Sequence, residues 1–104
     1  MVKWSEKLYI GEQAAKKAEK FRKKIEAGKL VNGVFLITKP SNGQNLMDIL
    51  PSKELLFPYY KRRELFVYGL AKGKDEAEEL VLTILEDVYR KTDGLCCKEY
   101  FEAE

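Results

Sequence analysis

Residues 64–81, ELFVYGLAKGKDEAEELV, decide the fold, because an apolar run gives way to a helical pattern within this stretch. Residues 64–71 are rich in branched and aromatic side chains, as expected of a buried strand. Apolar residues then recur at helical spacing until Gly94, which predicts an amphipathic helix with one buried face. The residues of that face are Ala77, Leu80, Val81, Ile84, Leu85 and Val88.

The turn between this strand and this helix, GLAKGKD, is either a site that binds an anion or a corner that only connects the two elements. Asp75 and Glu78 stand three residues apart and predict a capping box at the helix N-terminus. Together with Glu76 and Glu79, they put negative charge where an anion would otherwise bind. The turn also lacks the GxGxxG spacing of dinucleotide-binding loops. The sequence therefore favours a corner.

The segment GVFLIT, residues 33–38, is short, apolar and rich in branched side chains, which predicts a second buried strand. Within the connection to the strand at 64–71, Ser52 is expected to cap a helix. A strand, a helix and a strand in this order favour a parallel pair joined by a right-handed crossover. Val34–Ile37 would then lie beside Leu65–Tyr68 and run in the same direction.

Parallel strands end at the same edge of a sheet, where ligands of open α/β proteins bind. The prediction therefore brings the residues that follow the two strands together, beside the N-terminus of the last helix. A small anion would bind there through ammonium groups and hydrogen-bond donors. The candidate ligand-binding residues are Lys39, Ser41, Asn42, Lys72, Gly73 and Lys74.

A helix is also predicted from Glu12 to just before Gly28, with Ser5 as a candidate cap, although residues 8–10 could instead form a short strand. Its apolar residues recur at spacings of four, three and four: Ala14, Ala18, Phe21 and Ile25. The opposite face is basic. With the aromatic and cationic cluster at 59–63, it has the composition of a nucleic-acid-binding surface, although a solvated helix face is the simpler alternative. The candidate residues are Lys16, Lys20, Arg22, Lys23, Lys24 and Arg62.

These elements predict one α/β or α+β domain over residues 1–104, with a small sheet of two to three strands, at least one parallel pair and amphipathic helices packed on it. A sheet of two strands is too small to be stable alone. A third strand would come from residues 7–11, from the tail at 95–101 or from a second copy of the chain. The last alternative is a physical reason to expect a homodimer.

The composition excludes several chemistries. The chain has no histidine, which removes histidine-dependent acid–base catalysis and most zinc sites. Cys96 and Cys97 are adjacent and lack the C-x-x-C spacing, so they indicate free thiols. No stretch approaches the ~20 apolar residues of a membrane span, and the N-terminus has no signal-peptide core. We therefore expect a cytoplasmic protein with no catalytic residue, metal site, cofactor or membrane partner.

Charge is distributed unevenly along the chain, although the net charge is only +2. Residues 1–30 carry nine Lys or Arg against four Glu, whereas residues 64–104 carry five against eleven Asp or Glu. One part of the surface should be basic and another acidic. This polarity favours self-association or internal pairing at least as readily as nucleic-acid binding.

The run VYGLAKGKDEAEELVLTILEDVY, residues 67–89, and the upstream ILPSKELL, residues 49–56, resemble a group of short uncharacterised bacterial proteins. The resemblance covers most of the chain. It implies a compact bacterial α/β protein, and it implies no activity.

The sequence as a whole favours a non-catalytic binding or protein-interaction module, with a second copy of itself or another protein as partner. Two alternatives stay open. One is a nucleic-acid-binding protein that uses the basic helix face, and the other is a protein that binds a small anion at the shared strand edge.

Overall fold

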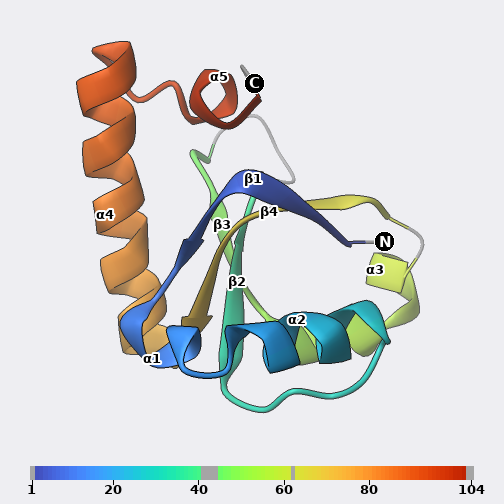
Figure 1. The fold of residues 1–104 in the computed structure, drawn as a ribbon. Helices are drawn as coiled ribbons and strands as arrows, with labels where there is room; N and C mark the ends of the chain where they lie inside the picture. Colours follow the sequence, from blue (N-terminus) through green and yellow to red (C-terminus); the bar gives the residue numbers. More distant parts are fainter. Residues whose placement is uncertain (1, 41–44, 62, 103–104) are drawn as a thin grey trace.

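A mixed four-stranded sheet forms the centre of the molecule, with its strands in the order β1-β4-β2-β3 (Figure 1). The computed structural model describes residues 2–40, 45–61 and 63–102. The strands are β1 (Val2–Ile10), β2 (Val34–Thr38), β3 (Asp48–Pro51) and β4 (Leu65–Lys72). The helices are α1 (Glu12–Ala15), α2 (Ala18–Glu26), the 3-10 helix η1 (Ser52–Leu56), α3 (Pro58–Lys61), α4 (Lys74–Thr92) and α5 (Cys97–Glu102).

The direction predicted for the two central strands is wrong. β2 pairs with β4 antiparallel, with Val34 opposite Lys72 and Leu36 opposite Leu70. The expected helical crossover is absent from the described part of the connection, because the chain first turns back as β3, antiparallel to β2. It then passes through η1 and α3 and enters β4 in the direction of β3. The prediction of at least one parallel pair is confirmed, but that pair is β1 with β4.

The sheet has four strands, not the two to three predicted. The alternative of a strand at residues 7–11 is close to what the structure contains, since β1 covers Val2–Ile10. The tail forms the helix α5 and adds no strand. β3 was not expected, because it is short and ends at Pro51, a residue more typical of turns and strand ends. A four-stranded sheet removes the reason for completing it with a second chain.

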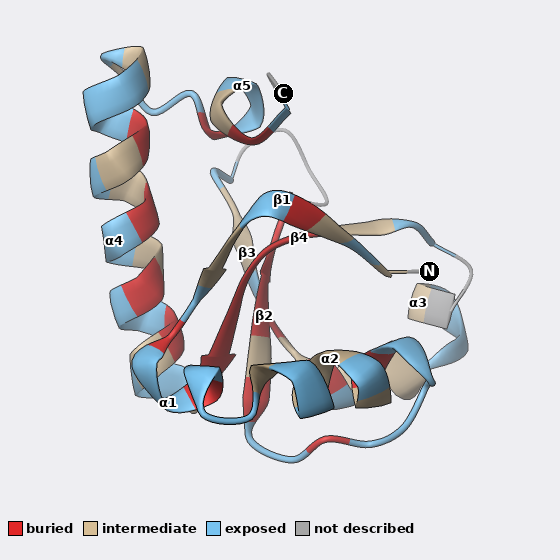
Figure 2. Cartoon of the chain, in the orientation of Figure 1, coloured by how far each residue is buried: buried red, intermediate tan, exposed pale blue. Residues whose placement is uncertain are grey.

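Helices cover both faces of the sheet, and the buried residues lie between the layers (Figure 2). On one face, α4 and α5 pack over Ile37 and Tyr68. The predicted apolar face of α4 is confirmed, because Ala77, Leu80, Ile84 and Val88 are buried. On the other face, α1 and α2 cover Leu36, Val67 and Leu70. Tyr68 stacks on Phe101 of α5 with ring centroids 3.9 Å apart, which fixes the tail against the sheet.

The helix predicted from Glu12 is divided in two. α1 ends at Ala15, and α2 begins after Lys17, whose backbone departs from helical geometry. The expected face is kept across the break, since Ala14 and Ile25 are both buried. Gly28, just past the end of α2, has a φ of +74°, which is favourable for glycine and confirms its predicted place beyond the helix.

The predicted side-chain caps are not formed. Gly73 occupies the N-cap of α4, and Asp75 lies inside the first turn, so no capping box is present. Ser52 donates its hydroxyl hydrogen to the carbonyl of Val31 at 2.8 Å and so joins η1 to the loop before β2. In residues 2–40, 45–61 and 63–102, no helix has the length and apolar character needed to cross a membrane.

Candidate anion-binding surface

The residues expected to share one strand edge lie at opposite ends of the sheet. The backbone N–H of Lys39 donates to the carbonyl of Phe66, near the start of β4, whereas Lys72 ends that strand. This separation follows from the antiparallel pairing, so the premise of the predicted anion site is wrong. Lys39 instead forms an ion pair with Glu102 at 2.9 Å. Ser41 and Asn42 lie outside the described residues.

Beside the turn at Gly73 and Lys74, backbone N–H groups donate to a side chain of the protein itself, the carboxylate of Glu76. This carboxylate accepts hydrogen bonds from the backbone N–H groups of Gln13 at 2.6 Å, Ala14 at 3.1 Å and Lys72 at 2.8 Å. Burial by itself would raise the pKa of Glu76, but these three donors outweigh it and hold the pKa below its ordinary value. The carboxylate therefore stays charged and joins α4 to α1 and β4, which agrees with the interpretation of the turn as a corner.

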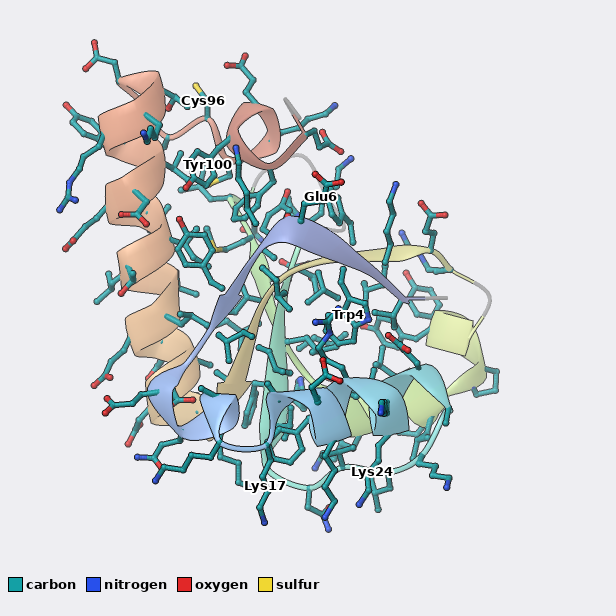
Figure 3. The ribbon with its side chains drawn as sticks, viewed as in Figure 1. Trp4, Glu6, Lys17, Lys24, Cys96 and Tyr100 are labelled. Carbon is teal, nitrogen blue, oxygen red and sulfur yellow. The ribbon has the colours of Figure 1, made fainter. Side chains whose placement is uncertain are left out.

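A second surface brings lysines together from separate elements. A hollow of about 390 Å³ lies beside α1 and α2, next to the loop before β2, and we call it the basic hollow. None of the described residues that line it is acidic. Its lining lysines are Lys16, Lys17, Lys20, Lys24 and Lys72. Figure 3 shows Lys17 and Lys24 on the side of α2 that faces away from Trp4.

The position of Lys72 in the basic hollow is fixed by tertiary contacts. Its ammonium group donates to the carbonyl of Asn32 at 3.2 Å and lies 5.7 Å from the ring centre of Phe21 on α2. The N–H of Gly73 donates to the carbonyl of Gly33 at 2.7 Å, which holds the end of β4 against the loop before β2. A strand end and a helix face thus present positive charge to the same space, where the electrostatic potential of several lysines adds.

The residues predicted to bind nucleic acid are only partly brought together. Lys16, Lys20 and Lys24 line the basic hollow, whereas Lys23 is exposed and is not among the lining residues. Arg22 lies against the other side of α2, with its guanidinium 5.0 Å from the ring centre of Trp4. Arg62 lies outside the described residues.

Lys17 and Lys72 belong to the hollow and were not predicted as part of a basic face. Lys17 lies at the break between the two helices, so helical spacing cannot place it. Lys72 is 48 residues beyond Lys24 in the sequence, and only the packing of β4 beside the loop at 30–33 brings it near α2. The signal for Lys17 was its neighbour Lys16, whereas Lys72 was predicted only as part of an anion site at the turn after its strand and not beside the lysines of α2.

No model of a protein family matches this chain, and comparisons with curated proteins and with solved structures also found no match.

Proposed function

We propose that this chain is a non-catalytic binding module whose ligand is nucleic acid, bound through the basic hollow and the adjoining faces of α1 and α2. The observation that carries the proposal is the convergence of five lysines on one hollow whose described lining contains no acidic residue. Lysine and arginine bind the phosphates of nucleic acids, and these contacts supply most of the sequence-independent affinity.

A polymer suits this surface better than a small anion does. Lys20 and Lys24 lie one turn apart on α2, about 6 Å along the axis, and Lys16 lines the same hollow from beyond the helix break. A row of separated cations can contact successive phosphates of a flexible strand. Four of the five lysines are exposed at the surface, whereas a small anion would need several donors held in fixed positions for tight binding.

The experiment is an anisotropy titration with a labelled single-stranded RNA, a single-stranded DNA and a duplex, between about 50 and 200 mM salt. The test variant carries Lys16→Ala, Lys20→Ala and Lys24→Ala. The matched control carries Lys53→Ala, Lys91→Ala and Lys98→Ala, three exposed lysines outside the hollow, so both variants lose the same charge.

We expect the hollow variant to lose at least about tenfold in affinity, or 1.4 kcal/mol, and the control to lose much less. Equal losses in the two variants would show that net charge is responsible and not the hollow. Absence of binding to all three probes at the lowest salt would overturn the proposal and leave a protein partner as the ligand of this module.

A further inference from the structure

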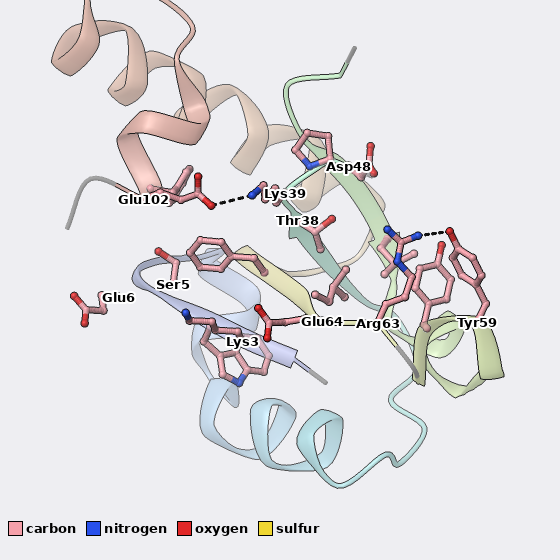
Figure 4. Close-up of a pocket in the computed structure, with 17 residues that line it drawn as sticks. Lys3, Ser5, Glu6, Thr38, Lys39, Asp48, Tyr59, Arg63, Glu64 and Glu102 are labelled. Atoms are coloured by element: carbon pink, nitrogen blue, oxygen red, sulfur yellow. Dashed lines mark hydrogen bonds and ion pairs between the residues drawn. The ribbon is translucent and has the colours of Figure 1, made fainter. Parts of the chain in front are cut away.

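A larger hollow lies at the opposite side of α2 from the lysines, at the end of the sheet where β2 ends and β4 begins (Figure 4). We call it the sheet-end hollow. Its volume of about 620 Å³ lies within the usual range for small-molecule sites. Apolar side chains of Trp4, Leu50 and Leu65 form part of its wall, and Tyr59 and Tyr60 contribute from α3.

The hydroxyl of the buried residue Thr38 opens onto this hollow and has no protein partner among the described residues. Thr38 is only 2% exposed and lines the hollow. Within residues 2–40, 45–61 and 63–102, no hydrogen bond involves its hydroxyl. Figure 4 shows the Thr38 side chain between the Lys39–Glu102 pair and the Arg63–Tyr59 pair, pointing into the hollow. Among the described residues, Tyr68 is the one whose side-chain oxygen is both fully buried and unpartnered, so the Thr38 hydroxyl is open to the hollow and can accept a hydrogen bond there.

The cations among the described residues of this hollow are already engaged. Lys39 is paired with Glu102, and Arg63 donates to the hydroxyl of Tyr59, with its guanidinium 5.1 Å from that ring centre. The ammonium of Lys3 lies 5.8 Å from the ring centre of Phe66. An anionic ligand would have to compete with these contacts, so the engaged cations disfavour an anion.

Among the described residues of the lining, four carboxylates stand against three cations: Glu6, Asp48, Glu64 and Glu102 against Lys3, Lys39 and Arg63. Glu64 is exposed and takes part in no ion pair or hydrogen bond with any described residue. An available carboxylate, a hydroxyl that can accept a hydrogen bond and an apolar wall together match a ligand with a positive head group on an aliphatic chain. An ammonium group carries three donors and no acceptor, which suits Glu64 and the oxygen of Thr38.

We propose that the sheet-end hollow binds an alkylammonium group, with Glu64 as counter-charge, Thr38 as hydrogen-bond acceptor, and Trp4 and Leu65 against the methylene chain. The ammonium group can be carried by a free diamine or polyamine or by a lysine side chain of a peptide, and these share the chemistry recognised here. This site is separate from the basic hollow and has the opposite preference for charge.

Trp4 provides the measurement, because it is the only tryptophan in the chain and lines the hollow. Its fluorescence is followed during titration with 1,4-diaminobutane, with spermidine, with lysine blocked at both backbone ends, and with propionate as a probe of opposite charge. We expect a saturable change with at least one ammonium probe and none with propionate. Binding of the amines alone identifies a free polyamine, and comparable or tighter binding of blocked lysine identifies a peptide.

Two variants test the named residues. Glu64→Gln removes the counter-charge, and Thr38→Val removes the hydroxyl while keeping the shape of the buried side chain. We expect each to weaken ammonium binding several-fold, whereas Glu79→Gln, an equal charge change at an exposed position on α4, leaves it unchanged. Thermal unfolding of each variant checks that it is folded.

Three results would overturn the proposal. They are absence of a saturable response in the wild-type protein at millimolar amine, equal affinity of Glu64→Gln and Glu79→Gln, and preferential binding of propionate.

Discussion

The carboxylate of Glu76, in the first turn of α4, lies 2.6 Å from the backbone nitrogen of Gln13, so one helix supplies the N-terminal cap of another. α1 has no side-chain cap of its own at Gly11, and the first N–H groups of any helix lack partners within it. Glu76 satisfies this need and also accepts from Lys72 at the end of β4. One carboxylate therefore joins α1, β4 and α4.

Replacing Glu76 with Gln should destabilise the fold at neutral pH by about 1–2 kcal/mol, because charge-assisted hydrogen bonds to three backbone donors are lost or weakened. Urea unfolding measures the difference. Glu78→Gln is the matched control, since Glu78 is exposed on the same helix and should change stability by less than about 0.5 kcal/mol.

The loss of stability caused by Glu76→Gln should be largest at neutral pH and should decrease in acid. The folded-state pKa of Glu76 is lowered, so the stability it contributes is fully present above the ordinary glutamate pKa of the unfolded chain. That contribution is lost as the pH falls through the lowered folded-state pKa. The stability difference between wild type and variant should therefore shrink in acid. A difference that stays constant from neutral pH to strongly acidic pH would contradict the proposed role of the charge.

Gly11→Ala should act through the same carboxylate. Gly11 has ordinary extended backbone angles, so alanine brings no backbone strain, but its Cβ would overlap the carboxylate of Glu76. We expect a loss of about 1–2 kcal/mol, as for other overpacked sites. In a Glu76→Ala background, the same change should cost almost nothing, and a double-mutant cycle measures this coupling. Gly94→Ala, where a Cβ meets only Cys96 at 3.6 Å, is the control.

The buried Tyr68 and the half-buried Tyr9 should respond in opposite ways to loss of their hydroxyl groups. The hydroxyl of Tyr68 has no hydrogen-bond partner among the described residues, and burial raises its pKa to about 12. Tyr9 donates to Asp87 at 2.7 Å, and since its single hydrogen is used there, Tyr100 donates to Tyr9. Burial, followed by these two hydrogen bonds, raises the pKa of Tyr9.

Tyr68→Phe should therefore leave stability unchanged or raise it by up to about 1 kcal/mol, because no hydrogen bond is lost and a desolvated polar atom is removed. Tyr9→Phe should cost about 1–2 kcal/mol, because two hydrogen bonds that join β1 to α4 and α5 are lost. Thermal unfolding of the two variants under identical conditions provides the comparison. Clear destabilisation by Tyr68→Phe would mean that its hydroxyl has a bound partner, such as an ordered water.

The sequence was most informative where the signal is local. The buried face of α4 and the strand at 65–72 could be predicted, because the apolar pattern of each is complete within a short stretch of sequence. The direction of β2 relative to β4 could not be predicted, because it depends on the intervening β3, four residues that end in Pro51. β1 was only half anticipated, because its polar edge-strand sequence breaks register between Trp4 and Tyr9 and alternates poorly.

The candidate site shows the same limit. Lys20 and Lys24 share a helix face at a spacing of four, so their proximity could be predicted from the sequence. Lys72 joins them only because β4 ends beside the loop before β2. The sequence singled out Lys39 and the cluster at 59–63, which both contribute to the sheet-end hollow, but it did not bring them together, since residues from β1, β2, α3 and β4 meet there through strand order. Which distant segments pair with one another could not be predicted from one sequence.

The two adjacent cysteines should differ sharply in reactivity. Cys96 is exposed, whereas Cys97 is buried between α5 and α4, and burial raises the pKa of its thiol. Thiolate is the reactive form, so both access and pKa protect Cys97. We expect one thiol per chain to react rapidly with a disulfide reagent under native conditions and two in denaturant. Cys96→Ser should abolish the fast phase, and a fast phase that persists in this variant would contradict the assigned burial.

Lys72 should contribute one phosphate contact if nucleic acid occupies the basic hollow. Lys72→Met keeps much of the aliphatic stem against Phe21 and removes only the charge, so the fold should tolerate it. Loss of one such contact should reduce the slope of log affinity against log salt by about 0.7 for a single strand and weaken binding similarly for different base sequences. Lys74→Met is the matched control, because Lys74 is exposed two residues away and does not line the hollow. If both variants reduce the slope equally, or neither does, Lys72 makes no specific phosphate contact and the ligand lies elsewhere on the basic surface.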